Sequence, residues 1–158
     1  MRQIPHGTSL QTGEAWAIAF TYFTVAITVS LVHSTAGTPT WVIVAATLIV
    51  NSATATLAYA AVTTAGGSVA AGVASGWLTS TRFGVLAAAL APRLWPQRWK
   101  RALAAFSAFD PNIALANREE KDEDVRRVYV AMSLWLVLPW WLGASIGALI
   151  GDLVSDPK

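Results

Sequence analysis

The most constraining feature of this chain is a run of 67 consecutive residues, 15–81, that contains no Asp, Glu, Lys or Arg. A second charge-free run covers residues 128–151. A soluble domain of 158 residues exposes part of nearly every element to water, and charged side chains usually keep such surfaces hydrated. Both runs are continuous rather than alternating, and a lipid environment requires the backbone to be hydrogen-bonded internally. They therefore predict membrane-embedded helices.

The composition excludes several classes of function. Charged residues make up 13% of the chain, against roughly 25% in soluble domains. The absence of Cys excludes disulfides, thiol catalysis and Cys-ligated metals, and the only two histidines, His6 and His33, lack a ligand spacing. The net charge of +2 is too small for a nucleic-acid-binding surface. We expect no metal, no cofactor and no nucleic-acid partner.

The two charge-free runs have room for four transmembrane helices of about 20 residues each. Gly37 and Pro39 separate the first two predicted spans, Gly66 ends the second, and Pro92 ends the third. The predicted spans are residues 15–32, 41–62, 69–91 and 128–150, and Pro139 is expected to kink the last one. We therefore expect an all-α, polytopic integral membrane protein with about four spans, in which residues 1–158 form a single membrane domain.

Residues 93–127 separate the third span from the fourth and contain eight of the eleven Lys and Arg residues. Apolar side chains within this segment recur at helical spacing, opposite Arg98 and Arg101: Trp95, Trp99, Leu103 and Phe106. This pattern predicts an amphipathic helix lying at the membrane interface. Asp110 before Pro111 predicts a new helix with Asp110 as its N-cap.

The cationic segment 93–127 is expected to be cytoplasmic, because cytoplasmic loops are rich in Lys and Arg. Counting spans from it puts both termini outside. A dip of residues 103–116 into the bilayer would make the count odd and change this orientation.

Arg82 lies near the middle of the third predicted span, where an arginine costs at least about 2.5–3.5 kcal/mol on insertion scales. One interpretation is that its planar donor fork binds an anion or carboxylate on a transport path. The alternatives are pairing with an acid or carbonyls of a neighbouring helix, or a shorter span with a snorkelling side chain.

Polar residues recur on one face of each of the first two predicted spans: Glu14, Thr21, Thr24 and Thr28, then Thr40, Thr47, Asn51 and Thr54. Two such stripes predict a wetted seam between the helices, and Asn51 is the best candidate for substrate contact. The alternative is interhelical hydrogen bonding that stabilises the bundle. Glu14 is either a coupling group or simply an acidic residue in a first helical turn.

Small residues recur every four positions in two of the predicted spans: Ser68, Gly72, Gly76, Ser80, Gly84 and Ala88, then Gly143, Gly147 and Gly151. This spacing lets helix backbones approach closely, within the chain or with a partner. Glycines at these positions also allow a helix to unwind around a substrate.

The order and spacing of these features resemble the AzlC-like family of branched-chain amino-acid exporters over about residues 13–151. The resemblance rests on five segments: Gly13-Glu14 with Gly37-Thr38-Pro39-Thr40-Trp41, Gly66-Gly67-Ser68, Thr81-Arg82-Phe83-Gly84 with Leu90-Ala91-Pro92-Arg93-Leu94, Phe109-Asp110-Pro111 with Ile113-Ala114-Leu115-Ala116, and Trp140-Trp141-Leu142-Gly143 with Ile146-Gly147-Ala148-Leu149-Ile150-Gly151. The chain departs from the family pattern at the Gln of the second span, where it reads Asn51 to Thr56. It also has Phe83 in place of His and Pro111 in place of Glu.

The resemblance implies a non-enzymatic subunit of a secondary transporter that exports branched-chain amino acids across the bacterial plasma membrane. Arg82 would bind the substrate carboxylate, and either Asp110 or Glu14 would be the proton-coupling group. Further polar residues would line the path: Asn51, Thr47, Thr54, Thr21 and Thr24. Since family members continue with more spans, the chain is expected to be a short member. A small AzlD-like subunit, a homo-oligomer or both would complete it.

An alternative reading is a non-transporting membrane subunit that packs a partner through the glycine seams. The missing Gln and His favour this alternative. A membrane enzyme is disfavoured, because the spans contain no paired carboxylates, nucleophile–base pair or metal-ligand set.

Overall fold

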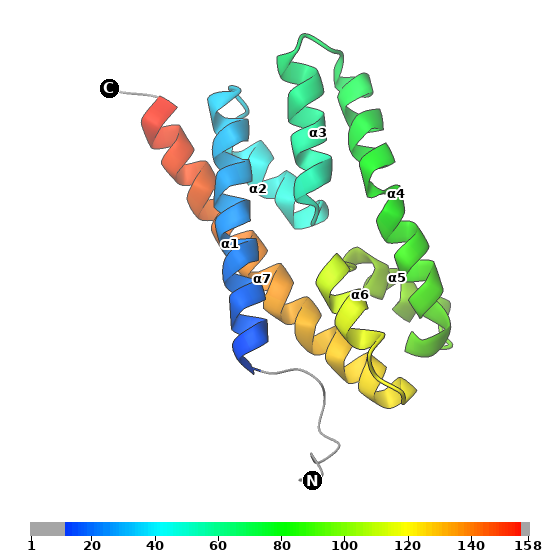
Figure 1. The fold of residues 1–158 in the computed structure, drawn as a ribbon. Coiled ribbons are helices and arrows are strands. Elements are labelled where there is room, and N and C mark those ends of the chain that lie inside the picture. Colours follow the sequence, from blue (N-terminus) through cyan, green and yellow to red (C-terminus); the bar gives the residue numbers. More distant parts are fainter. Residues whose placement is uncertain (1–11, 156–158) are drawn as a thin grey trace.

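A computed structural model describes residues 12–155, and all regular secondary structure in this range is α-helical. The helices are α1 (Thr12–Thr35), α2 (Thr40–Ile49), α3 (Ala53–Thr64), α4 (Val69–Leu94), α5 (Arg98–Phe106), α6 (Asp110–Ala116) and α7 (Asp122–Ser155). The expected all-α class is confirmed (Figure 1). Two helices in this range are long and apolar enough to cross a membrane, Gly13–Thr35 and Asp122–Val154.

Glycines of α7 hold α1 and α7 together along a shared seam. A Cβ at Gly143 would collide with the carbonyl oxygen of Phe23, and one at Gly147 would collide with that of Ile27. Further along, Gly151 lies against Ser34. Because the contact positions increase together along both helices, α1 and α7 run parallel.

Glycines of α4 lie against α3 in a similar way. Gly72 faces the Tyr59 ring, and Gly76 faces the carbonyl of Ala55. Here the contact positions change in opposite senses, so α3 and α4 are antiparallel. Gly84 differs from the other repeated glycines, because nothing lies within 4 Å of a Cβ built there. Its expected packing contact is absent within residues 12–155.

The second predicted span, 41–62, is wrong as a continuous helix. The chain leaves α2 at Val50 in an extended conformation and starts α3 after the N-cap Ser52. By their residue counts, α2 and α3 are about 15 and 18 Å long, each about half of a hydrocarbon core of about 30 Å. Side chains rather than Gly or Pro stabilise this break, because the Ser52 hydroxyl accepts the Ala55 N–H at 3.3 Å.

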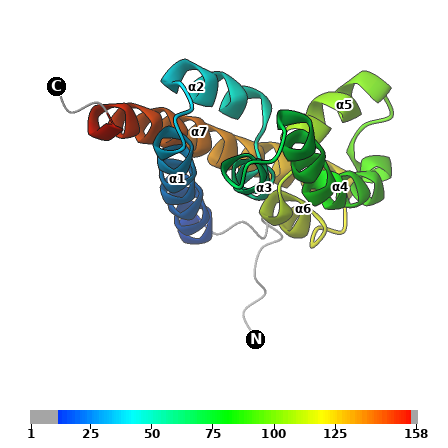
Figure 2. The same ribbon diagram turned by 90° about the horizontal axis from the view of Figure 1, so that it is seen from above.

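The break gives the fold a path that differs from four alternating crossings. In Figure 1, α1 and α7 rise from the end that holds α5 and α6, and α4 descends toward that end. Between them, α2 descends to mid-height and α3 returns to the upper end. Viewed from above, α7 runs along α2, and part of it passes behind α3 and α4 (Figure 2).

The helix predicted from Asp110 and Pro111 exists as α6, but its expected N-cap is wrong. The N-cap is Phe109, and its backbone N–H donates to Asn112 Oδ1 at 2.9 Å. Asp110 is therefore the first residue of the helix, and its side chain is available for another partner.

Candidate functional site: an ion pair beside a broken helix

The guanidinium of Arg82 and the carboxylate of Asp110 form an ion pair, with Nη2 and Oδ2 3.2 Å apart. Arg82 lies near the middle of α4, and Asp110 begins α6, so two distant segments supply the two charges. The Arg82 side chain is 52% exposed and that of Asp110 is 48% exposed. The Phe83 ring, 4.8 Å from the guanidinium carbon, adds a cation–π contact. Arg82 thus has the acidic neighbour that the sequence allowed for, but the pair is open to a third group.

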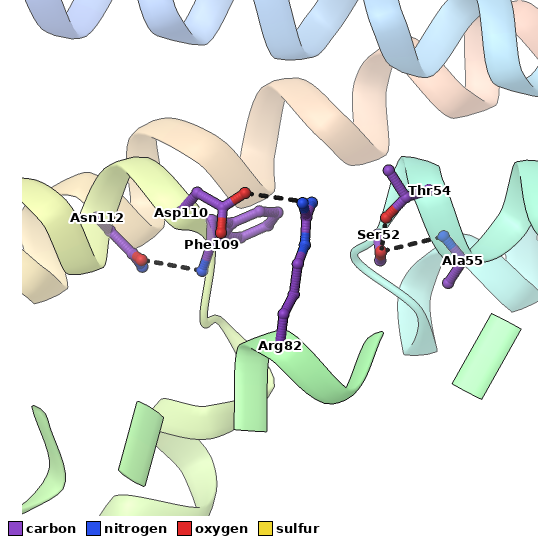
Figure 3. A network of polar contacts seen from close by, with 7 residues as sticks. All are labelled: Ser52, Thr54, Ala55, Arg82, Phe109, Asp110 and Asn112. Carbon is purple, nitrogen blue, oxygen red and sulfur yellow. Dashed lines mark hydrogen bonds and ion pairs between the residues drawn. The ribbon is translucent and has the colours of Figure 1, made fainter. Parts of the chain in front are cut away.

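Figure 3 shows the guanidinium extending into the space between Asp110 and the start of α3. On the α3 side, the hydroxyls of Ser52 and Thr54 lie 3.2 Å apart. A helix N-terminus carries a partial positive charge. The guanidinium and the positive end of α3 therefore lie on the same side of the Asp110 carboxylate (Figure 3), an arrangement that favours binding of an additional anionic group.

Asn51 occupies the break itself and is 9% exposed. Its Nδ2 donates to the Phe106 carbonyl at 3.2 Å, and its Oδ1 accepts from Trp141 Nε1 at 3.2 Å. The amide thus connects the break to the end of α5 and to α7. Asn51 was predicted to contact substrate, but in this structure its side chain holds the broken helix in position.

A buried polar network that the sequence analysis missed positions Asp110. Asn112, with no exposed surface, donates to the Ser107 carbonyl at 2.6 Å and to Ser133 Oγ at 3.0 Å. The same residue caps the Phe109 N–H, so it fixes the start of α6 from three directions. The available signal was the Asn directly after the Asp-Pro pair, where its short side chain reaches back to the backbone.

Two of the predicted path residues, Thr21 and Thr24, and the candidate coupling residue Glu14 form other contacts than the ion pair. Thr21 and Thr24 are exposed on α1 and bond to carbonyls of their own helix. Glu14 forms a 3.6 Å ion pair with Arg118 at the start of α1. The expected wetted seam between the first two spans is absent from residues 12–155, because the α1 threonines face outward.

Thr47 is buried, donates to the Val44 carbonyl and lines a cavity of about 650 Å³ between α2, α3 and α4. His33 also lines this cavity and stacks on Tyr59, with ring centroids 6.2 Å apart. The His33 Nε2 is buried and has no hydrogen-bond partner. Val50 and Ser80 also line the cavity. Val50 lies at the helix break, and Ser80 is two residues before Arg82 in α4.

The polar groups of this region are one ion pair and the hydroxyls at the start of α3. Within residues 12–155, no cluster of His, Cys, Asp or Glu could hold a metal ion. The ion pair offers one cationic fork and one carboxylate side by side, both partly accessible. Such a pair can receive a small molecule that carries both charges.

A protein-family model described as AzlC protein matches residues 17–154. No curated protein and no solved structure matches the chain.

Proposed function

Since the chain belongs to the AzlC family, we propose that it is a subunit of a secondary transporter that exports amino acids across the bacterial plasma membrane. The family supports a membrane transport role. Branched-chain amino acids are the substrates we propose within that class. The observation that carries the proposal is the half-exposed Arg82–Asp110 pair beside the start of α3.

An amino-acid zwitterion carries one carboxylate and one ammonium group, so it can bind both members of the Arg82–Asp110 pair at once. Its carboxylate replaces Asp110 at the guanidinium and approaches the positive end of α3. Its ammonium group forms an ion pair with the Asp110 carboxylate, which no longer contacts the guanidinium. A helix broken near mid-length, with a half-helix N-terminus toward the substrate carboxylate, is a recurrent arrangement in transporters.

We propose an orientation with the cationic segment 93–127 in the cytoplasm, following the excess of Lys and Arg. The ion pair between Glu14 and Arg118 supports an arrangement with the start of α1 on the same side. In this arrangement α1, α4 and α7 cross the membrane, and α2 with α3 forms a re-entrant pair. The count of crossings becomes odd, which revises the expectation that α1 begins outside.

A partner subunit is favoured by the exposed apolar face of α4. Trp77 is 79% exposed, Leu78 is 71% exposed and Val85 is 72% exposed. Gly84 on the same helix leaves open space for a second backbone. We propose that a small AzlD-like membrane protein packs there. The same face also supports the second candidate function, a non-transporting subunit that stabilises this partner.

Export of L-leucine and L-valine from loaded cells or proteoliposomes, with the AzlD-like partner present, tests the transport role. The variant R82Q should lose at least about tenfold in rate, the equivalent of one charge-assisted hydrogen bond of about 1.4 kcal/mol. R118Q, which removes the ion pair between Arg118 and Glu14, serves as the matched control and should retain export.

The exchanged pair R82D/D110R separates substrate binding from a structural role. A purely structural ion pair would be restored by the exchange, and export would return. A substrate site would stay inactive, because the carboxylate-binding fork no longer faces the start of α3. Normal export by R82Q would contradict the proposal.

A further inference from the structure

Helix α5 carries three cations, Arg98, Lys100 and Arg101, and none of them takes part in the ion pairs found among residues 12–155. Three of the other cations of segment 93–127 are paired with acidic side chains, one of them Arg118 with Glu14. Arg93 pairs with Asp122, and Arg127 pairs with Asp124. The positive charge of α5 is therefore available to a partner outside this part of the chain.

A groove of about 520 Å³ lies between α5 and α7, directly beside these cations. Its walls are largely apolar and aromatic, with Trp95, Trp99 and Trp141 among the lining residues. Lys100 is the cation of α5 that lines it, and its Nζ lies 5.5 Å from the Trp99 ring centroid. The volume falls within the range of about 300–1,000 Å³ typical of small-molecule sites.

The groove follows α7 from Tyr129 to Trp141, a distance of about 18 Å by helical rise. One leaflet contributes half of a hydrocarbon core of about 30 Å. The groove thus begins at a cationic helix and continues inward for about the depth of one leaflet. Trp99 and Leu103, 63% and 66% exposed, extend the apolar surface outward along α5.

We propose that this groove binds one anionic phospholipid. An acyl chain lies along α7 between the tryptophans, and the phosphate is held by Lys100, with Arg98 and Arg101 contributing to the local positive potential. Charge complementarity favours an anionic headgroup over a zwitterionic one, by about fivefold in affinity for each cation near the surface. The site is separate from the Arg82–Asp110 pair and does not depend on which solute is transported.

Titration of the purified full-length chain in non-ionic detergent, read by native mass spectrometry, tests the site. Dioleoyl phosphatidylglycerol should bind at least about fivefold more tightly than dioleoyl phosphatidylcholine, and K100Q should remove about fivefold of that affinity. The matched control K121Q removes a cation of the same segment that does not line the groove, and it should bind as the wild type does.

A second pair of variants tests the acyl-chain half of the site without changing charge. V130W places a large ring in the groove and should weaken binding of both lipids. L138W adds the same ring to an exposed position of α7 outside the groove and should have no effect. Inorganic phosphate at the same concentration should not displace the lipid.

Equal affinities for the two lipids would overturn the proposal. So would a K100Q variant indistinguishable from K121Q, or displacement by inorganic phosphate. A partner protein that covers the groove and prevents lipid binding in the assembled complex would overturn it as well.

Discussion

Two regions of this molecule are held together in different ways. Along the seam between α1 and α7, Gly143 and Gly147 bring the two backbones into direct contact and leave no room for a side chain. Around Arg82 and Asp110, the contact is a half-exposed ion pair beside a broken helix. A close backbone seam cannot separate without losing many contacts at once, whereas an exposed pair can open at little cost. The α1–α7 seam is therefore suited to be the scaffold, and the ion-pair region is suited to rearrange around a solute.

The largest effect is expected from G147L, which pushes a branched side chain into the Ile27 backbone. We expect a loss of at least about 3 kcal/mol, the upper end of the usual cost of overpacking. G84L is the matched control, because a side chain there meets open space, and it should change stability by no more than about 0.5 kcal/mol. Unfolding in detergent, measured without the partner, compares the two variants. Equal stability would remove the distinction between a tight and a loose region.

N112A should have the next largest effect. Without the Asn112 amide, the buried Phe109 N–H and the Ser107 carbonyl lose the hydrogen bonds that define the start of α6. Two unsatisfied buried groups correspond to about 2–3 kcal/mol. The same unfolding measurement gives the loss in stability, and transport should fall in parallel because Asp110 is no longer positioned. N117A, an exposed asparagine at the other end of α6, is the control and should be neutral.

The long helices, including α1 and α7, could be predicted from the sequence, whereas the helix break beside the ion pair could not. The ends of the spans predicted at 15–32 and 69–91 fall within three residues of the ends of α1 and α4, and those of 128–150 within six residues of the ends of α7, because Gly, Pro and charged residues mark them. The break at Asn51 lacks these signals. Its stabilising partners, Phe106 and Trp141, are 55 and 90 residues away in the chain.

The candidate site was predicted residue by residue but not as an arrangement. Arg82 and Asp110 were both candidates, yet their pairing depends on how α6 packs on α4 and α7, which local spacing does not encode. Conversely, Thr21 and Thr24 do share a helical face, as their spacing indicated. Periodicity identifies which residues share a face but not what that face contacts, and theirs is exposed.

N51A tests whether the helix break belongs to the scaffold or to the rearranging region. The substitution removes one hydrogen bond to the Phe106 carbonyl and one from Trp141 Nε1. Because these bonds are only partly buried, the expected loss is about 1–2 kcal/mol. Transport should fall further than stability alone explains, since the start of α3 would no longer be held toward Arg82. A variant with unchanged transport would place the break outside the substrate path.

The smallest change in stability is expected from R82Q/D110N, which removes the ion pair that we place at the centre of function. Each side chain is about half exposed, and pairs of this kind contribute about 0–1 kcal/mol. The double variant should therefore unfold within about 1 kcal/mol of the wild type while losing export of L-leucine and L-valine. Stability and transport would then be separated: N117A and R82Q/D110N should be about equally stable, but only N117A should export. A large loss of stability in R82Q/D110N would instead make the pair part of the scaffold, and the contrast with the α1–α7 seam would no longer hold.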